Sequence, residues 1–248
     1  MKITTLNLQG FDHWDTREAA IITHLTAEAP DIVLFQEAVY LPDISPYNQA
    51  QLLNGTLHFP YQQSVISRLQ VGLEYPVYRE GLAALSRHPI VSSDTIVLKQ
   101  AEDDHHQRIV QLLDIYIDEQ VVPIANIHFS ITDDFDFATP QLQELFDILA
   151  ARGEQRIIMG DFNLNDLDAS AELWRDHYVA STAFDYISYP REDKRIDYAL
   201  VPKSYALEQV TTSGDDLSDH RALTASISLL DIRTAGRQRR QLAKTPRD

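Results

Sequence analysis

Short apolar runs in this sequence repeatedly border a carboxylate, amide or imidazole side chain, and this pattern constrains the fold more than any other feature. The runs have the length of buried β-strands. The polar residues at their ends are Asn7, Gln36, Glu37, His128, Asp161, Asn163, Asp197, Asp219 and His220. Because side chains at the ends of adjacent strands converge, we expect these residues to line one cleft.

Strand-like runs outnumber helical segments, and many are neighbours in the sequence. Strands are expected at residues 3–8, 31–37, 81–86, 90–98, 108–117, 121–128, 156–159, 196–201 and 222–229. Helices are expected from a capping box at Asp15 to the residue before Pro30, and at residues 48–53, 140–151 and 171–176. Neighbouring strands with fewer helices predict an α/β fold in which two packed sheets are flanked by helices.

The segment 38–79 is the least regular part of the sequence, with four prolines, five tyrosines and weak periodicity. A long irregular stretch in a compact domain is often functional, although packed surface structure explains it equally well. We expect this segment and the loop 131–137 to shape a pocket.

The last residues differ in charge from the rest of the chain. Residues 231–248 contain six basic and two acidic side chains, which predicts a flexible, solvated tail after a single domain of residues 1–230. Binding of this tail to nucleic acid or anionic lipid is the alternative. The body has 15 basic and 35 acidic residues, a net charge of −20, within a chain total of −16. Duplex nucleic acid is therefore a disfavoured partner, because binding to duplexes depends on basic contacts with phosphate.

Composition narrows the chemistry further. The sequence has no cysteine, which excludes disulfides, thiolate metal sites and a cysteine nucleophile. No apolar run is long enough to span a bilayer and the first residues do not resemble a signal peptide, so a cytoplasmic location is expected. Carboxylate and amide oxygens suit a hard cation such as Mg²⁺ or Mn²⁺, and nearby imidazoles suit proton transfer or phosphate binding.

The motifs resemble those of the endonuclease/exonuclease/phosphatase superfamily, which includes deoxyribonuclease I, exonuclease III-type repair enzymes, inositol polyphosphate 5-phosphatases and neutral sphingomyelinases. The matching segments, in family order, are Leu6-Asn7, Leu34-Phe35-Gln36-Glu37, residues 81–87, Asn126-Ile127-His128, Gly160-Asp161-Phe162-Asn163, Arg195-Ile196-Asp197-Tyr198 and Ser218-Asp219-His220. Single motifs of this kind are common, but the full ordered set is specific. The resemblance implies a four-layer α/β sandwich with two central sheets.

The resemblance also implies roles for individual residues. Glu37 corresponds to the main metal ligand, Asn7 to an amide that touches the metal or its waters, and Asp219 to a second metal or metal-water ligand. Asp161 corresponds to the aspartate near the attacking water, and Asn163 to an amide that holds a phosphate oxygen. His220 corresponds to the catalytic histidine, which Asp197 orients. Either Asp161 or His220 is the general base.

Three further positions bear on the substrate. A histidine at His128 resembles the deoxyribonuclease, sphingomyelinase and 5-phosphatase branches rather than exonuclease III-type enzymes. Arg87 and Arg108 are candidates for contacts with substrate phosphate, although ion pairs within this acidic chain explain them equally well. The segment 102–106, which contains His105 and His106, predicts a polar hairpin tip in preference to a second metal site.

Together these features predict a metal-dependent hydrolase of phosphoric esters that uses water as the attacking group. The favoured substrate is a phosphodiester of a small molecule or lipid head group. A metal-dependent nuclease is the alternative within the superfamily, and a non-enzymatic binding protein is a weaker one, since every expected catalytic position is filled.

Overall fold

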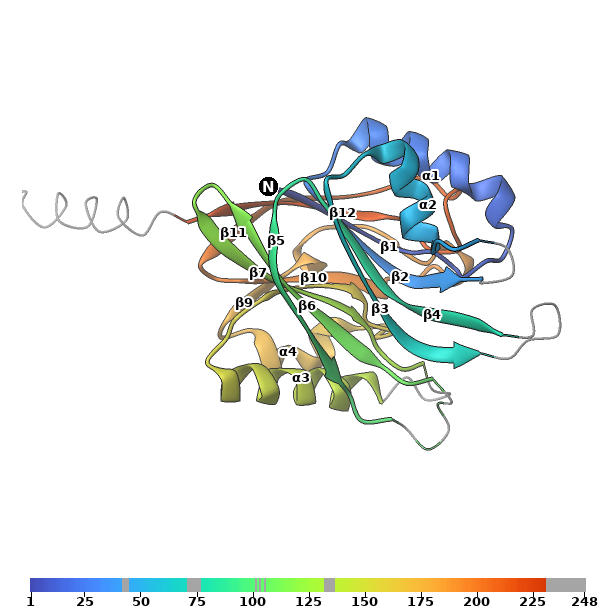
Figure 1. Cartoon of the computed structure of the whole chain (residues 1–248). Coiled ribbons are helices and arrows are strands. Elements are labelled where there is room, and N and C mark those ends of the chain that lie inside the picture. Colours follow the sequence, from blue (N-terminus) through green and yellow to red (C-terminus); the bar gives the residue numbers. More distant parts are fainter. Residues whose placement is uncertain are drawn as a thin grey trace, which may run out of the picture.

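A computed structural model describes residues 1–41, 45–70, 77–100, 102, 104, 106–131 and 137–230 (Figure 1). Two six-stranded sheets form its centre. The first sheet has the strand order β11 (Tyr205–Thr212), β12 (Leu223–Leu229), β1 (Lys2–Asn7), β2 (Ile32–Tyr40), β4 (Tyr78–Ser86) and β3 (Tyr61–Gln70). The second has the order β5 (Ile90–Val97), β6 (Ile109–Ile117), β7 (Gln120–His128), β8 (Ile157–Asp161), β10 (Asp197–Pro202) and β9 (Tyr178–Ala180).

Helices cover the outer faces of both sheets, as Figure 1 shows. α1 (Trp14–Glu28) and α2 (Gln49–Leu57) pack on the first sheet, where Ile21 and Leu53 join a buried cluster with Phe35. α3 (Ala138–Arg152) and the short α4 (Ala171–Trp174) pack on the second sheet. A third apolar cluster fills the space between the sheets. This arrangement confirms the predicted four-layer α/β sandwich with two central sheets.

A parallel strand pair lies at the middle of each sheet, and the two pairs bring the predicted site residues together. β1 pairs with β2 so that Asn7 lies beside Gln36, and β7 pairs with β8 so that His128 lies beside Asp161. β10 runs antiparallel to β8 and places Asp197 beside Asp161. Most of the predicted strand-end residues therefore meet at one end of the sandwich.

The approach of β7 to β8 depends on Gly160. A Cβ at this position would lie 2.1 Å from the carbonyl oxygen of Ile127, and its φ is +146°. Because no other residue adopts this backbone without severe strain, the glycine before Asp161 is required by the close packing of these strands.

Buried amide side chains link the two sheets next to the site. Gln36 Nε2 donates to Asn126 Oδ1 at 2.6 Å, and Asn126 Nδ2 donates to the Phe35 carbonyl and to Gln111 Oε1. Gln36 belongs to the first sheet, whereas Asn126 and Gln111 belong to the second. The hydrogen bonds therefore fix the residue before Glu37 against the strand that ends in His128.

The segment 38–79 is more regular than its sequence predicts. β2 continues to Tyr40, α2 follows, and β3 and β4 form a hairpin whose residues 71–76 lie outside the described residues, as do residues 42–44. Asn48 caps α2 by accepting from Gln51 N, and the Gln51 side chain accepts from Asn48 N. β3 was missed because it is an edge strand with many polar residues, and cross-strand pairing with β4 stabilises it instead of an apolar pattern.

Other predicted boundaries also need correction. The structure adds β9 and β11, which lie at sheet edges. The capping box predicted at Asp15 is wrong, because α1 begins at Trp14 and its N-cap residue, His13, makes no side-chain cap hydrogen bond. Over the described residues, no helix combines the length and the apolar character that a membrane crossing requires. The predicted tail, residues 231–248, lies outside the described residues.

Candidate active site

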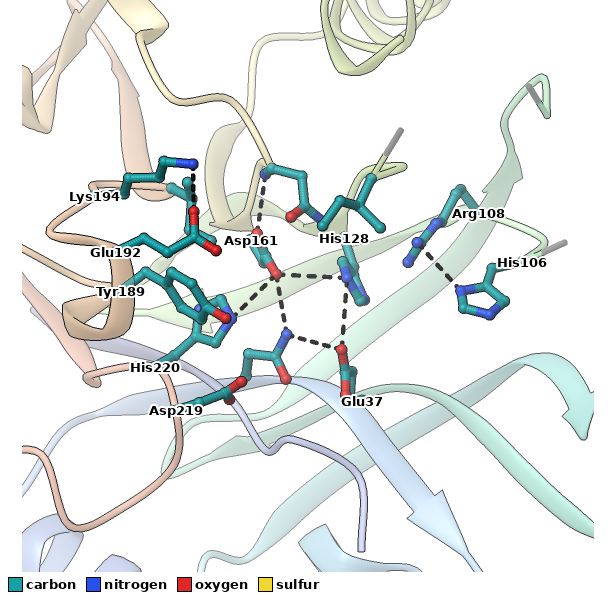
Figure 2. Close-up of a pocket in the computed structure, with 14 residues that line it drawn as sticks. Glu37, His106, Arg108, His128, Asp161, Tyr189, Glu192, Lys194, Asp219 and His220 are labelled. Atoms are coloured by element: carbon teal, nitrogen blue, oxygen red, sulfur yellow. Dashed lines mark hydrogen bonds and ion pairs between the residues drawn. The ribbon is translucent and has the colours of Figure 1, made fainter. Parts of the chain in front are cut away.

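A cavity of about 190 Å³ opens at the ends of the central strands (Figure 2). Seven of its lining residues were predicted from the sequence, and they are Asn7, Glu37, His128, Asp161, Asn163, Asp219 and His220. Arg108, predicted as a phosphate contact, lines the same cavity. The remaining lining residues are His106, Ile131, Tyr189, Glu192, Lys194 and Ile196.

Asp161 lies at the centre of this group, as Figure 2 shows, and is 1% exposed. Its Oδ2 accepts from Asn7 Nδ2 at 3.0 Å, and its Oδ1 accepts from the Asn163 backbone N–H at 3.0 Å. His128 Nε2 is 3.5 Å and His220 Nε2 is 3.8 Å from Oδ2. One carboxylate oxygen therefore faces an amide and two imidazoles.

His220 is held by Asp197, which lies behind it. His220 Nδ1 and Asp197 Oδ2 are 2.8 Å apart, and both residues are buried. Burial by itself lowers the pKa of His220, but the charges of Asp197 and Asp161 outweigh it and raise this pKa to about 10. His220 is therefore an imidazolium at neutral pH. Asp197 does not line the cavity, consistent with an orienting role.

His128 has the opposite electrostatic setting. Burial and the positive charge of Arg108 lower its pKa well below 6.5. Its Nε2 lies 3.5 Å from Asp161 Oδ2 and 3.9 Å from Glu37 Oε1. A neutral imidazole whose Nε2 faces two acceptor oxygens carries its proton on that nitrogen and can donate it in a hydrogen bond.

A β-bulge in β2 turns Glu37 toward the cavity. The register with β4 shifts between Phe35 and Ala38, and Glu37 has a φ of +50°. Such a backbone is unfavourable for a residue other than glycine and is typically found at functional positions. The side chain accepts from Asn7 Nδ2 at 3.2 Å.

Burial and neighbouring negative charge raise the pKa values of two carboxylates of this cavity. Burial and the charge of Glu80 raise the pKa of Glu37 to about 7, and burial and the charge of Asp197, partly offset by His220, raise that of Asp161 to about 6. Asp219, on the same cavity, accepts from Ser218 Oγ and lies 3.7 Å from the Arg191 guanidinium. Carboxylate oxygens are the ligands that hard divalent cations prefer, so the carboxylates of this cavity fit such an ion.

A second group of possible metal ligands lies deeper. Asp161, Asp197 and His220 each offer a ligand atom, and these atoms lie within 4.8 Å of one another. The 2.8 Å hydrogen bond between His220 and Asp197 already uses the facing atoms of that pair. The assignment of Glu37, Asn7 and Asp219 as the metal ligands stays a prediction.

The two candidate phosphate-binding arginines lie in different places. Arg108 lines the cavity, with Nε donating to Asp104 Oδ2 at 3.1 Å. Arg87 lies outside the cavity, since its guanidinium stacks 4.6 Å from the Phe59 ring centroid and its Nε donates to the Pro30 carbonyl. This geometry gives Arg87 a structural role.

The segment 102–106 lies in the connection between the antiparallel strands β5 and β6, as predicted for a hairpin tip, but part of it is buried. Asp104 is 5% exposed and paired with Arg108, and His106 lines the cavity. Asp103 and His105 lie outside the described residues. The prediction was wrong for Asp104 because a run of charged residues does not reveal a buried partner four positions along the chain.

One wall of the cavity was not foreseen. It is formed by the 3₁₀ turn Pro190–Glu192 and its neighbours Tyr189 and Lys194. The centroid of the Tyr189 ring lies 5.1 Å from that of the His220 ring. Glu192 and Lys194 form an ion pair there. Their position just before Arg195-Ile196-Asp197-Tyr198 was the only signal in the sequence.

Comparisons with known proteins agree with this fold. The protein-family model described as "Endonuclease/Exonuclease/phosphatase family" matches residues 4–220. A search of curated proteins finds no significant match.

Several solved structures share the architecture. A family protein from Leptotrichia buccalis is 20% identical with a TM-score of 0.73, over 92% of this chain and 100% of that one. The human Nocturnin catalytic domain with bound sulfate is 18% identical with a TM-score of 0.70, over 93% and 94%. A mannosyl-6-phosphatase from Bacteroides thetaiotaomicron is 14% identical with a TM-score of 0.67, over 92% and 100%. At these identities the similarity shows a shared fold.

Proposed function

We propose that this chain, which belongs to the endonuclease/exonuclease/phosphatase family, hydrolyses a phosphodiester of a small molecule or lipid head group. Members of this family are metal-dependent phosphoesterases, so phosphoester hydrolysis is the activity of the family and the substrate class is our proposal. The observation that carries the proposal is the position of Asp161 between a neutral His128 and a protonated His220, in a cavity that also contains Glu37 and Asp219.

Glu37, Asn7 and Asp219 would hold the metal, for which Mg²⁺ and Mn²⁺ are the candidates. When bound, such an ion offsets negative charge on a phosphate oxygen and on the leaving oxygen. The raised pKa values of Glu37 and Asp161 support this assignment, because a cation would stabilise their ionised forms.

Two side chains are available to bind the phosphate group itself. His128 offers its Nε2–H, and Asn163 offers the second N–H of its side-chain amide, since the first donates to the Phe129 carbonyl at 2.9 Å. Hydrogen bonds from fixed donors in a water-poor cavity stabilise the charge that develops in the transition state. The left-handed backbone of Asn163, with a φ of +49°, turns this residue into the cavity.

The two candidates for the general base differ in protonation. Because the pKa of His220 is raised to about 10, its imidazole already carries the proton that a base would accept. Asp161 has a pKa of about 6 and is ionised in most molecules at neutral pH. We therefore assign Asp161 as the base for the attacking water, while His220 stabilises negative charge and can supply a proton. Asp197 keeps the imidazolium in place.

The charge of the protein supports a small substrate over duplex DNA. The chain has a net charge of −16, and carboxylates dominate one part of the cavity. A duplex nuclease needs basic contacts along the phosphate backbone to release counterions. The preference for the histidine-bearing branches of the family rests on His128 alone and stays a prediction.

The test is hydrolysis of bis(p-nitrophenyl) phosphate, p-nitrophenyl phosphate, sphingomyelin and plasmid DNA in Mg²⁺ or Mn²⁺. We expect the small diester to be the best of these substrates, and chelation with EDTA to abolish turnover. Glu37→Gln should reduce turnover and weaken metal binding measured by calorimetry, whereas Arg152→Gln, a change in a surface ion pair with Asp94, serves as the control. Full activity after chelation, or plasmid nicking that exceeds diester hydrolysis, would contradict the proposal.

A further inference from the structure

Arg108 and His106 lie at the end of the cavity away from Asp161 and Asp219. Figure 2 shows Arg108 and His106 on the far side of His128 from Asp161 and His220. The mechanism proposed above uses neither residue. Their position in the same cavity raises the question of what they bind.

Arg108 is held rigidly although it is almost completely buried. The residue is 4% exposed, and its Nε donates to Asp104 Oδ2 at 3.1 Å. Asp104 is itself 5% exposed, and its other oxygen accepts from the His106 backbone N–H at 2.7 Å. Since both partners are buried and hydrogen-bonded, the guanidinium has one defined position.

This anchoring leaves donors of Arg108 unused. A guanidinium has five N–H groups, of which Nε–H serves Asp104. Nη2 lies 3.5 Å from His106 Nδ1, and Nη1 has no acceptor among the residues that the structure describes. The other nearby carboxylate, Glu80, is already paired with Arg68 at 2.8 Å.

His106 adds a donor to the same place. His106 Nδ1 lies 3.5 Å from Arg108 Nη2 and 3.8 Å from Asp104 Oδ1, and the neutral form with its proton on Nε2 accepts from Arg108 and offers Nε2–H to a ligand. Burial and the charges of Arg68 and Arg108 lower the pKa of His106, which favours this neutral form. The two side chains thus present N–H donors, those of Arg108 from a guanidinium whose charge Asp104 partly balances, and donors of this kind recognise a phosphate.

We propose that Arg108 and His106 form a second anion site, and that the substrate is a small phosphoester that carries a second phosphate group. This inference rests on the proposed function, in which His128 and Asn163 bind the scissile phosphate. His128 stands between that position and Arg108, so the second phosphate belongs to another part of the same molecule. Both positions line one cavity, so the two phosphates are expected to lie close together in the substrate.

Adenosine 5′-monophosphate and adenosine 3′,5′-bisphosphate test the proposal, because they differ only in the second phosphate. Binding of each to the full chain is measured by calorimetry in Mg²⁺ and as inhibition of bis(p-nitrophenyl) phosphate hydrolysis. We expect the bisphosphate to bind about tenfold to a hundredfold more tightly, the range for hydrogen bonds to a charged group. Arg108→Gln should reduce this ratio to near one.

The matched control is Arg156→Gln. Arg156 is also a buried arginine paired with carboxylates, Asp114 and Glu154, but it does not line the cavity. This variant should keep the preference for the bisphosphate even if its Tm falls. Should Arg108→Gln fail to fold, Arg108→Lys keeps the charge without the planar fork and should show an intermediate ratio.

Three results would overturn the inference. They are equal binding of both nucleotides by the wild-type protein, an equal loss of affinity for both in Arg108→Gln, and stronger competition by a short single-stranded oligonucleotide than by the bisphosphate. The second result would place Arg108 on the scissile phosphate instead. Absence of diester hydrolysis would contradict only the proposed function, since the calorimetric ratio does not depend on turnover.

Discussion

His128 and His220 lie on either side of Asp161, and their surroundings move their pKa values in opposite directions. The two residues are similarly buried, at 9% and 6% exposure. Burial lowers the pKa of both, but Arg108 adds a positive charge beside His128, whereas Asp197 and Asp161 add negative charges beside His220. The first is neutral and the second is a cation at neutral pH.

Burial disfavours the charged form of both histidines, and only at His220 do neighbouring negative charges, those of Asp197 and Asp161, outweigh it. A neutral imidazole donates one hydrogen bond, and an imidazolium supplies a charge and a proton. The two halves of the cavity can therefore bind a phosphate and stabilise its leaving group with the same residue type. Four changes to the protein or to the solution test this difference between His128 and His220. They are described from the largest expected effect to the smallest.

Substitutions of His220 and Asp197 should have the largest effect. His220→Ala is expected to lower kcat about 10²–10⁴-fold, the usual contribution of a positioned acid–base group. Asp197→Asn should also lower kcat, because an amide cannot stabilise the imidazolium. Steady-state kinetics of the single and double variants measure both losses.

The double variant decides whether the two residues act as one unit. We expect it to be little slower than His220→Ala, because residues that act together are strongly non-additive. If the two losses multiply instead, Asp197 has a role separate from His220. Metal binding by calorimetry should survive these changes better than it survives Glu37→Ala.

His128→Gln should have a smaller effect. Gln keeps an N–H donor but moves it, so kcat is expected to fall about 10²-fold, the lower end for loss of one transition-state donor. The pKa of His220, followed by NMR, should change little, because Asp197 and Asp161 dominate it. A large shift of that pKa would show that the two histidines are not independent.

Asn126→Ala should affect stability more than turnover. It removes the amide that joins Gln36 to β7, two residues before His128, and leaves buried partners unsatisfied. We expect the free energy of unfolding in urea to fall by about 1–3 kcal/mol and kcat to fall less than tenfold. A greater loss of kcat with unchanged stability would indicate a direct catalytic role for Asn126.

The smallest expected effect is the change of stability with pH in the unsubstituted protein. Since the folded pKa of His220 is raised to about 10, its contribution to stability is complete below pH ~6.5 and is lost as pH rises through 10. The pKa of His128 is lowered, so this residue affects stability in the acidic range instead. Its contribution to the free energy of unfolding is complete above pH ~6.5 and is lost as the pH falls below that value. NMR titration of the metal-free protein should show His220 protonated and His128 neutral at pH 8. Two histidines with equal midpoints would remove the contrast.

The sequence predicted the two-sheet sandwich and most of the residues that line the cavity, but not the edge strands β3, β9 and β11. Asn7, Glu37, His128 and Asp161 were recognisable because each ends or follows an apolar run, and parallel strands bring such ends together. The edge strands β3 and β11 were missed, since cross-strand pairing supports them more than their own residue pattern. Arg87 and Arg108 could not be told apart, because the sequence gives an arginine's charge but not its partners.

The sequence by itself determined the layers, the family and the residue types that meet in the cavity, because apolar periodicity and motif order are local properties of the chain. Only the tertiary structure decided the protonation states of those residues. The charge of His220 depends on Asp197 and Asp161, which are distant in sequence, and the neutrality of His128 depends on its burial and on Arg108, the residue before β6. Charge–charge energies follow distance and burial in space, and neither is written in the order of the residues.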